Sequence, residues 1–135
     1  MRGLFSWPLP MPTLDDPADT SGELRSLAAQ LRAFAHERDW EPFHAPKNLA
    51  CALAVEAAEL LEHFQWMTED ESRRLDDARR DAVALEAADV LLYLVQLADK
   101  LGIDLVDAAR RKIALNARRY PVETARGSSR KADPA

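Results

Sequence analysis

The sequence predicts an all-α protein built as a four-helix bundle. Its 135 residues suit a single domain, and hydrophobic residues make up 47% of them, as in ordinary globular proteins. Neither proline nor glycine occurs between Pro46 and Gly102, and apolar residues recur there at helical spacing. No segment stands out with the alternation of apolar and polar residues that marks a half-buried strand.

The first two helices are predicted from signals at their starts. Residues 20–23 form a capping box, and apolar residues at helical spacing follow it, which indicates a helix over about residues 21–38. Residues 39–45 are predicted to be a loop. Pro46 is a favoured first helical residue, and the second helix is expected to run from there to about Trp66.

The last two helices are bounded in the same way. A second capping box at residues 68–71 opens a helical region that is expected to end near Leu101, where a glycine follows. Asp104 can cap a final helix over about residues 105–119, and Pro121 stops that helix.

Three regions follow from this pattern. Residues 1–19 hold four of the eight prolines and are predicted to be a flexible arm. Residues 20–121 are the predicted folded domain, and residues 122–135 are predicted to be a flexible tail. The single Cys51 excludes an intramolecular disulfide bond, and its apolar neighbours predict a buried thiol.

Charge and hydropathy restrict the partners and the location. A net charge of −5 argues against binding a nucleic acid polymer, which requires a basic surface. No apolar run reaches the roughly 18–20 residues that a membrane span needs, and prolines interrupt the N-terminus where a signal peptide would be apolar. The protein is therefore predicted to be cytoplasmic.

Four acidic residues form two pairs with the same spacing. Glu56 and Glu59 lie three residues apart on the second predicted helix, and Glu86 and Asp89 lie three apart on the third. Because a helical turn takes about 3.6 residues, each pair projects from one side of its helix. Antiparallel packing of the two helices would bring all four carboxylates to one point.

Two interpretations of these acids stay open from the residues alone. Acidic pairs on helices usually face solvent, but Asp89 interrupts the apolar residues 87–95, where a charge needs a partner. Four converging carboxylates would repel one another unless a cation joined them, and oxygen ligands suit Mg²⁺ or Mn²⁺ better than zinc. His63, four residues beyond Glu59, is expected at the surface or beside such a site.

Four further segments accompany the acidic pairs in a characteristic order and spacing: Glu37–Leu49, Phe64–Trp66, Asp89–Val95 and Asn116–Pro121. Together they resemble the MazG-like all-α NTP pyrophosphatase superfamily over about residues 20–121, and within it the dCTP pyrophosphatase branch. The resemblance implies a four-helix MazG-like bundle that hydrolyses a nucleoside triphosphate to a monophosphate and pyrophosphate. The eukaryotic dCTP enzymes carry a histidine where this chain has Leu31, so base preference is the point that transfers least directly.

The resemblance also assigns roles to particular side chains. The carboxylates of Glu56, Glu59, Glu86 and Asp89 would hold Mg²⁺, or Mn²⁺, on the triphosphate of dCTP or a related pyrimidine nucleotide. Glu59 is the predicted general base. Four side chains would line the nucleotide pocket: Trp40, His44, Trp66 and Tyr93. Either tryptophan can stack on a base, and core packing is the alternative for both.

Three polar side chains share one face of the last predicted helix: Lys112, Asn116 and Arg119. The two cations can neutralise phosphate oxygens, and the amide can bond a sugar or base edge. A cationic last turn also complements the helix dipole without any ligand.

The third predicted helix is apolar on nearly every side between Val90 and Leu101, so it needs cover that three short helices do not supply. An oligomer, a dimer of dimers as in the family it resembles, is the predicted active form. The alternative function is a non-enzymatic helical module that binds a nucleotide or a partner helix. A di-iron type of bundle is disfavoured, because Glu59 and His63 lie four residues apart rather than three.

Overall fold

The computed structural model describes residues 20–132, and all regular structure within that range is helical. The predicted all-α class is therefore confirmed. Four long helices form the frame: α1 (Thr20–His36), α2 (Pro46–Glu62), α4 (Asp77–Leu101) and α5 (Leu105–Arg119). Two short helices and a 3₁₀ turn complete the chain: α3 (Glu69–Ser72), α6 (Val122–Ala125) and η1 (Glu41–Phe43). The predicted N-terminal arm, residues 1–19, lies outside the described residues.

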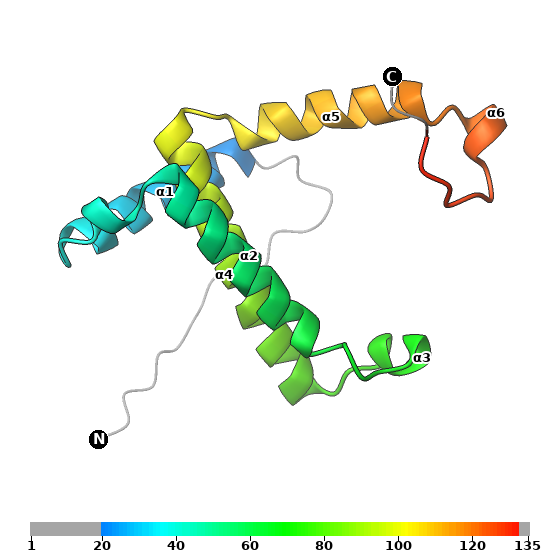
Figure 1. Ribbon diagram of the computed structural model, residues 1–135, viewed down its shortest axis with the longest axis horizontal. Helices are drawn as coiled ribbons and strands as arrows, with labels where there is room; N and C mark the ends of the chain where they lie inside the picture. Colours follow the sequence, from blue (N-terminus) through cyan, green and yellow to red (C-terminus); the bar gives the residue numbers. More distant parts are fainter. Residues whose placement is uncertain (1–19, 133–135) are drawn as a thin grey trace.

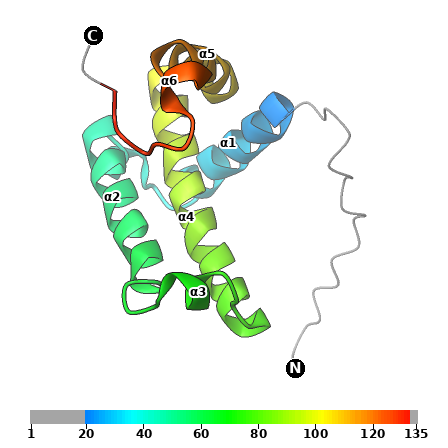
Figure 2. The same ribbon diagram turned by 90° about the vertical axis from the view of Figure 1, so that its right-hand side faces the viewer.

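The helices are arranged around one antiparallel pair. Helices α2 and α4 pack along each other, and α3 lies in the connection between them (Figures 1 and 2). Helix α1 crosses the C-terminal half of α4. Helix α5 contacts α1 and projects sideways from the end of α4, as Figure 1 shows. The fold is thus a helical hairpin with two further helices attached at one end.

The buried core is small and lies at that same end. Its members come from α1, the start of α2 and the second half of α4: Ala35, Leu49, Val95 and Ala98. Burying a leucine side chain such as Leu49, which is 1% exposed, contributes about 1.5–3 kcal/mol. An ion pair of 2.9 Å between Arg32 Nη1 and Asp99 Oδ1 joins α1 to α4. Because Arg32 is largely exposed, this pair contributes at most about 1 kcal/mol.

The helix boundaries follow the local signals in the sequence. Pro46 is the first residue of α2, and Thr68 and Glu71 form the expected capping box at α3. Gly102 ends α4 in the left-handed region, with φ of 65°. The Asp104 carboxylate accepts the N–H of Asp107 at 3.0 Å and caps α5. The capping contacts of Thr68, Glu71 and Asp104 satisfy backbone groups that the helix itself leaves without a partner.

Two boundaries differ from the sequence prediction, and both lie where the chain turns from α2 back to α4. Helix α2 ends at Glu62 rather than Trp66, because the chain tightens into turns such as that closed by Phe64 N–H and Leu61 O at 2.9 Å. The third predicted helical region is divided into α3 and α4. A separate cap begins α4, where the Asp76 carboxylate accepts the N–H of Arg79 at 2.8 Å.

Apolar side chains stay exposed on all four long helices, and on three of them some are at least half exposed. They include Val55 and Leu61 on α2, Leu85 on α4, and Ile113 and Leu115 on α5, each at least half exposed. Cys51, on α2, is also exposed, so the predicted burial of its thiol is wrong. The apolar stretch around Cys51 occupies more of the helix circumference than α4 covers.

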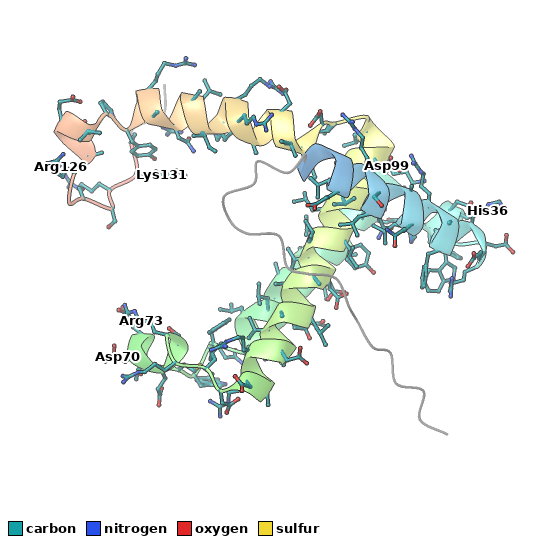
Figure 3. The ribbon with its side chains drawn as sticks, turned by 180° about the vertical axis from the view of Figure 1, so that it is seen from behind. His36, Asp70, Arg73, Asp99, Arg126 and Lys131 are labelled. Carbon is teal, nitrogen blue, oxygen red and sulfur yellow. The ribbon has the colours of Figure 1, made fainter. Side chains whose placement is uncertain are left out.

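The last described residues fold back onto the C-terminal end of α5. The Arg119 guanidinium donates to the carbonyl of Ala132 at 3.0 Å, and the N–H of Ala132 donates to the hydroxyl of Tyr120 at 3.2 Å. Arg126 and Lys131 lie at this far end of the molecule (Figure 3). The division into arm, domain and flexible tail stays a prediction.

Within residues 20–132, no helix combines the length and the apolarity that crossing a membrane requires. The cytoplasmic location stays a prediction.

Candidate active site

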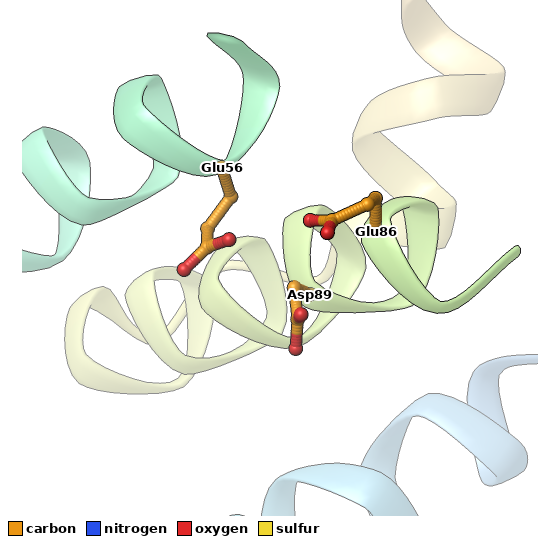
Figure 4. Close-up of side chains that lie close together, drawn as sticks. All are labelled: Glu56, Glu86 and Asp89. Carbon is orange, nitrogen blue, oxygen red and sulfur yellow. The ribbon is translucent and has the colours of Figure 1, made fainter. Parts of the chain in front are cut away.

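Three of the four predicted metal-binding carboxylates meet between α2 and α4. Glu56 extends from α2 towards Glu86 and Asp89 on α4, as Figure 4 shows. One oxygen atom from each of the three lies within 4.8 Å of the others. Glu56 and Glu86 are half-buried and Asp89 is exposed, so the cluster opens to solvent on one side. The antiparallel pairing of the two helices is what brings the acidic spacings together.

Glu59, the fourth predicted ligand, lies one turn beyond Glu56 on α2 and is exposed. It is not one of the three residues whose oxygens meet. Its carboxyl nevertheless interacts with that of Glu56. Burial raises the pKa of Glu56 above its usual value, and the hydrogen bond to Glu59 and the charges of Asp89 and Glu86 raise that pKa further. The folded chain therefore holds these acids closer together than their charges favour.

Glu86 carries the clearest sign of a missing partner. Its Oε2 atom is buried and has no hydrogen-bond partner among the described residues, while its Oε1 atom lies 3.8 Å from His63 Nε2. Three carboxylates with an unpartnered buried oxygen are the donor set that a hard divalent cation requires. The residues thus fit a divalent cation held by oxygen ligands.

The loop before α2 positions the first two predicted nucleotide-binding residues. Trp40 is 44% exposed and stands edge-on to the ring of Phe34, with centroids 5.8 Å apart, and to the ring of His44, with centroids 6.4 Å apart. The side-chain amide of Asn48 donates to the carbonyl of Phe43 at 3.1 Å and fixes the loop on α2. The core-packing alternative does not describe Trp40, because nearly half of its surface faces solvent.

The same loop is also tied to α1. His36 Nδ1 lies 2.7 Å from Glu41 Oε1. This hydrogen bond lowers the pKa of the Glu41 carboxyl.

Trp66 lies beyond the other end of α2 and is 88% exposed. It lines a cavity of about 300 Å³ together with Glu62, His63, Met67, Glu71 and Arg79. Since α2 has 17 residues, Trp40 and Trp66 flank a helix about 25 Å long. The structure therefore does not bring the two tryptophans into one pocket of a single chain.

The remaining predicted residues divide in the same way. Tyr93 is half-buried on α4, one turn beyond Asp89, and so adjoins the carboxylates. The three polar residues on α5 are exposed and belong to the helix that projects away from the α2–α4 pair (Figure 1): Lys112, Asn116 and Arg119. The structure does not bring them to the carboxylates of their own chain.

Sequence reasoning missed Arg79, which lines the cavity of Trp66. The signal that identifies it is its position seven residues before Glu86, since residues seven apart share a helix face.

This geometry defines an all-helical protein with a carboxylate cluster between antiparallel helices, and comparison with known proteins places it in a family. A model of the MazG-like family matches residues 51–133. The dCTP pyrophosphatase 1 of Homo sapiens is 47% identical over 131 residues, which cover 96% of this chain and 71% of that protein. The dCTP pyrophosphatase 1 of Bos taurus is 44% identical over 120 residues, covering 87% of this chain and 65% of that protein.

A solved structure agrees with this assignment. The crystal structure of a pyrophosphatase from Archaeoglobus fulgidus DSM 4304 superposes with a TM-score of 0.67 at 38% identity, covering 81% of this chain and 99% of that one. The chain belongs to the MazG-like family. It spans about two thirds to seven tenths of the length of the two curated relatives.

The raised pKa of Glu56 predicts how pH affects stability when no metal is present. An acid whose pKa is higher in the folded chain stabilises the fold fully below its unfolded pKa of about 4.5, and this contribution is lost as pH rises through the folded-state pKa. In EDTA, Glu56→Gln should therefore gain free energy of unfolding relative to the wild type as pH rises from 4 to 7. Urea denaturation at both pH values measures this difference.

Glu123→Gln is the matched control, because Glu123 is an exposed glutamate on α6. Its difference from the wild type should change less with pH than that of Glu56→Gln. A Glu56→Gln variant whose difference stays constant, or falls with rising pH, would contradict the repulsion described at this cluster.

Proposed function

We propose that this protein is a dCTP pyrophosphohydrolase, which hydrolyses dCTP or a related pyrimidine nucleotide to the monophosphate and pyrophosphate with Mg²⁺. The observation that carries the proposal is the cluster of Glu56, Glu86 and Asp89 on paired helices in a MazG-like chain. The similarity to dCTP pyrophosphatases over nearly the whole chain supports the substrate class. A module that only binds a partner helix would have no need of acids held together against their repulsion.

The proposed chemistry is the addition of water across the bond between the α and β phosphates. Glu56, Glu86 and Asp89, with Glu59 beside them, are the residues that would hold Mg²⁺, and Mn²⁺ suits the same donors. When bound, the cation supplies positive charge against the phosphate oxygens and acidifies water at the site. Glu59 is exposed and adjacent to Glu56, so it is placed to accept the proton of the attacking water.

The nucleotide would extend from the carboxylates towards the start of α2. Tyr93 continues the helix face of Asp89 by one turn, which supports a role for its hydroxyl in binding the sugar or a phosphate. Trp40 offers an exposed ring beside His44 for the base. Stacking on such a ring contributes about 1–3 kcal/mol by analogy with single-stranded nucleic acids.

A second copy of the chain would complete the site. Trp66 lies at the opposite end of α2 from Trp40, and Lys112 and Asn116 lie on the projecting helix α5. Exposed apolar side chains accompany these polar ones, for example Ile113 at 68%. An interface that covers the apolar residues of α5 and α2 would place the cations of one chain near the carboxylates of another. We therefore include an oligomer, a dimer of dimers, in the proposal.

The first test of this function identifies the products. Incubation with dCTP and Mg²⁺ should give dCMP and pyrophosphate in phosphorus NMR, and EDTA should abolish the reaction, because unneutralised carboxylates and phosphates repel. The other common nucleoside triphosphates should react more slowly. Orthophosphate with dCDP would place the cleavage at the γ phosphate and reject the proposal.

Glu59→Gln provides a matched variant for this assay, because it keeps the shape of the side chain. Loss of a general base should lower kcat by about 100-fold or more, while circular dichroism stays unchanged. A variant that keeps most of its turnover would remove Glu59 from the mechanism.

The second test asks whether two chains share a site. Asp89→Asn and Lys112→Ala should each be nearly inactive, but a mixture refolded at equal amounts should recover activity. A working site needs intact carboxylates from one chain and an intact α5 from another, so roughly a quarter of the sites should work. A steady-state assay of the mixture, with each variant refolded alone as control, measures the recovery. A mixture no more active than its two components would show that each chain forms its site alone.

A further inference from the structure

The imidazole of His63, at the C-terminal end of α2, lies next to the carboxylate cluster. His63 directly follows α2, and its backbone N–H donates to the carbonyl of Leu60 at 3.3 Å. Its ring lines a cavity of about 210 Å³ with Met67, Leu75, Arg79 and Val83. The side chain of His63 is 30% exposed, so its ring is packed at this position rather than free in solvent.

The two oxygens of Glu86 differ in their surroundings. Oε1 lies 3.8 Å from His63 Nε2, and Oε2 is buried with no hydrogen-bond partner within the part of the chain that the structure describes. Arg79, the other cation at this cavity, is directed to Asp76 at 3.9 Å. His63 is therefore the donor placed to hold Oε1, which leaves Oε2 as the atom available to a cation.

We propose that His63 is a positioning residue for Glu86, whose carboxylate it orients for the divalent cation by donating Nε2–H to Oε1. A small side-chain movement brings the two atoms from 3.8 Å to hydrogen-bond distance. Groups that hold a ligand in this way fix its rotamer, and their loss typically weakens metal binding about 10–100-fold. The proposal rests on the proposed function, because it assumes that the cluster binds a cation.

The contact also joins the two helices that carry the ligands. His63 directly follows α2 and Glu86 lies on α4, so the interaction crosses the α2–α4 interface. Glu56 is the proposed ligand from α2. It lies seven residues before His63, so the two side chains project from the same side of the helix. Orienting Glu86 from α2 therefore keeps its carboxylate turned towards Glu56 instead of towards solvent.

The test measures Mn²⁺ binding without nucleotide, by the loss of the free-ion signal in electron paramagnetic resonance. His63→Leu removes the donor and should weaken Mn²⁺ affinity by about 10-fold or more. His63→Gln retains an N–H donor and should restore most of that loss. His36→Leu, an exposed histidine at the end of α1, should bind Mn²⁺ like the wild type.

The outcomes separate this inference from the proposed function. If Glu86→Gln loses Mn²⁺ while His63→Leu binds it like the wild type, the cluster holds the metal and the positioning role is wrong. If His63→Gln falls as far as His63→Leu, the ring contributes by packing and not by donation, and the inference fails. If the wild type itself binds no Mn²⁺, both this inference and the proposed metal site are rejected.

Discussion

The repulsion among the carboxylates between α2 and α4 is the constraint on which the rest of the structure depends. Packing of the two helices brings oxygen atoms of Glu56, Glu86 and Asp89 within 4.8 Å of one another. Burial and the neighbouring acids raise the pKa of Glu56. Charges brought together in this way cost free energy unless a partner offsets them. Under the proposed function, a divalent cation bound to these carboxylates would offset this cost, so stability and function would be coupled at the same atoms.

The position of the core shows how the chain tolerates this cost. Leu49 and Val95 are buried where α1, α2 and α4 meet, whereas the cluster lies farther along the α2–α4 pair. Hydrophobic burial therefore stabilises the fold at one end of the hairpin, whereas repulsion among the carboxylates destabilises it at another part. Many apolar side chains outside the core remain exposed, including Leu61 and Ile113. Because few of the described side chains are buried, covering the exposed apolar ones with a second copy of the chain would stabilise the fold.

The local features were predictable because each depends on a few neighbouring residues. Pro46, the Thr68–Glu71 capping box and Gly102 act through their own backbone, and the structure places them where their patterns indicate. The family was also predictable, since the acidic spacing and its accompanying segments are specific. The division of α3 from α4 was missed because several polar residues occur in this segment. The sequence alone does not show that Asp76 is the one that caps a new helix.

The arrangement of the site was harder to predict, because it depends on distances across helices. Equal spacing on two helices predicts that four carboxylates meet at one point. In the structure, three have oxygens that all lie within 4.8 Å of one another, and Glu59 joins them through its hydrogen bond to Glu56. Both Trp40 and Trp66 belong to segments that resemble the family, but the two residues lie at opposite ends of α2. The contact of His63 with Glu86 likewise depends on how α2 ends, which no periodicity encodes.

The most direct test of the central claim is the effect of Mg²⁺ on thermal unfolding without nucleotide. A cation that binds only the folded chain raises Tm as its concentration rises above the dissociation constant. The wild type should therefore show a Tm that increases with Mg²⁺, and Asp89→Asn should show a much smaller increase at the same ionic strength. Equal Tm for the wild type with Mg²⁺ and with EDTA would contradict the account of these carboxylates as a metal site.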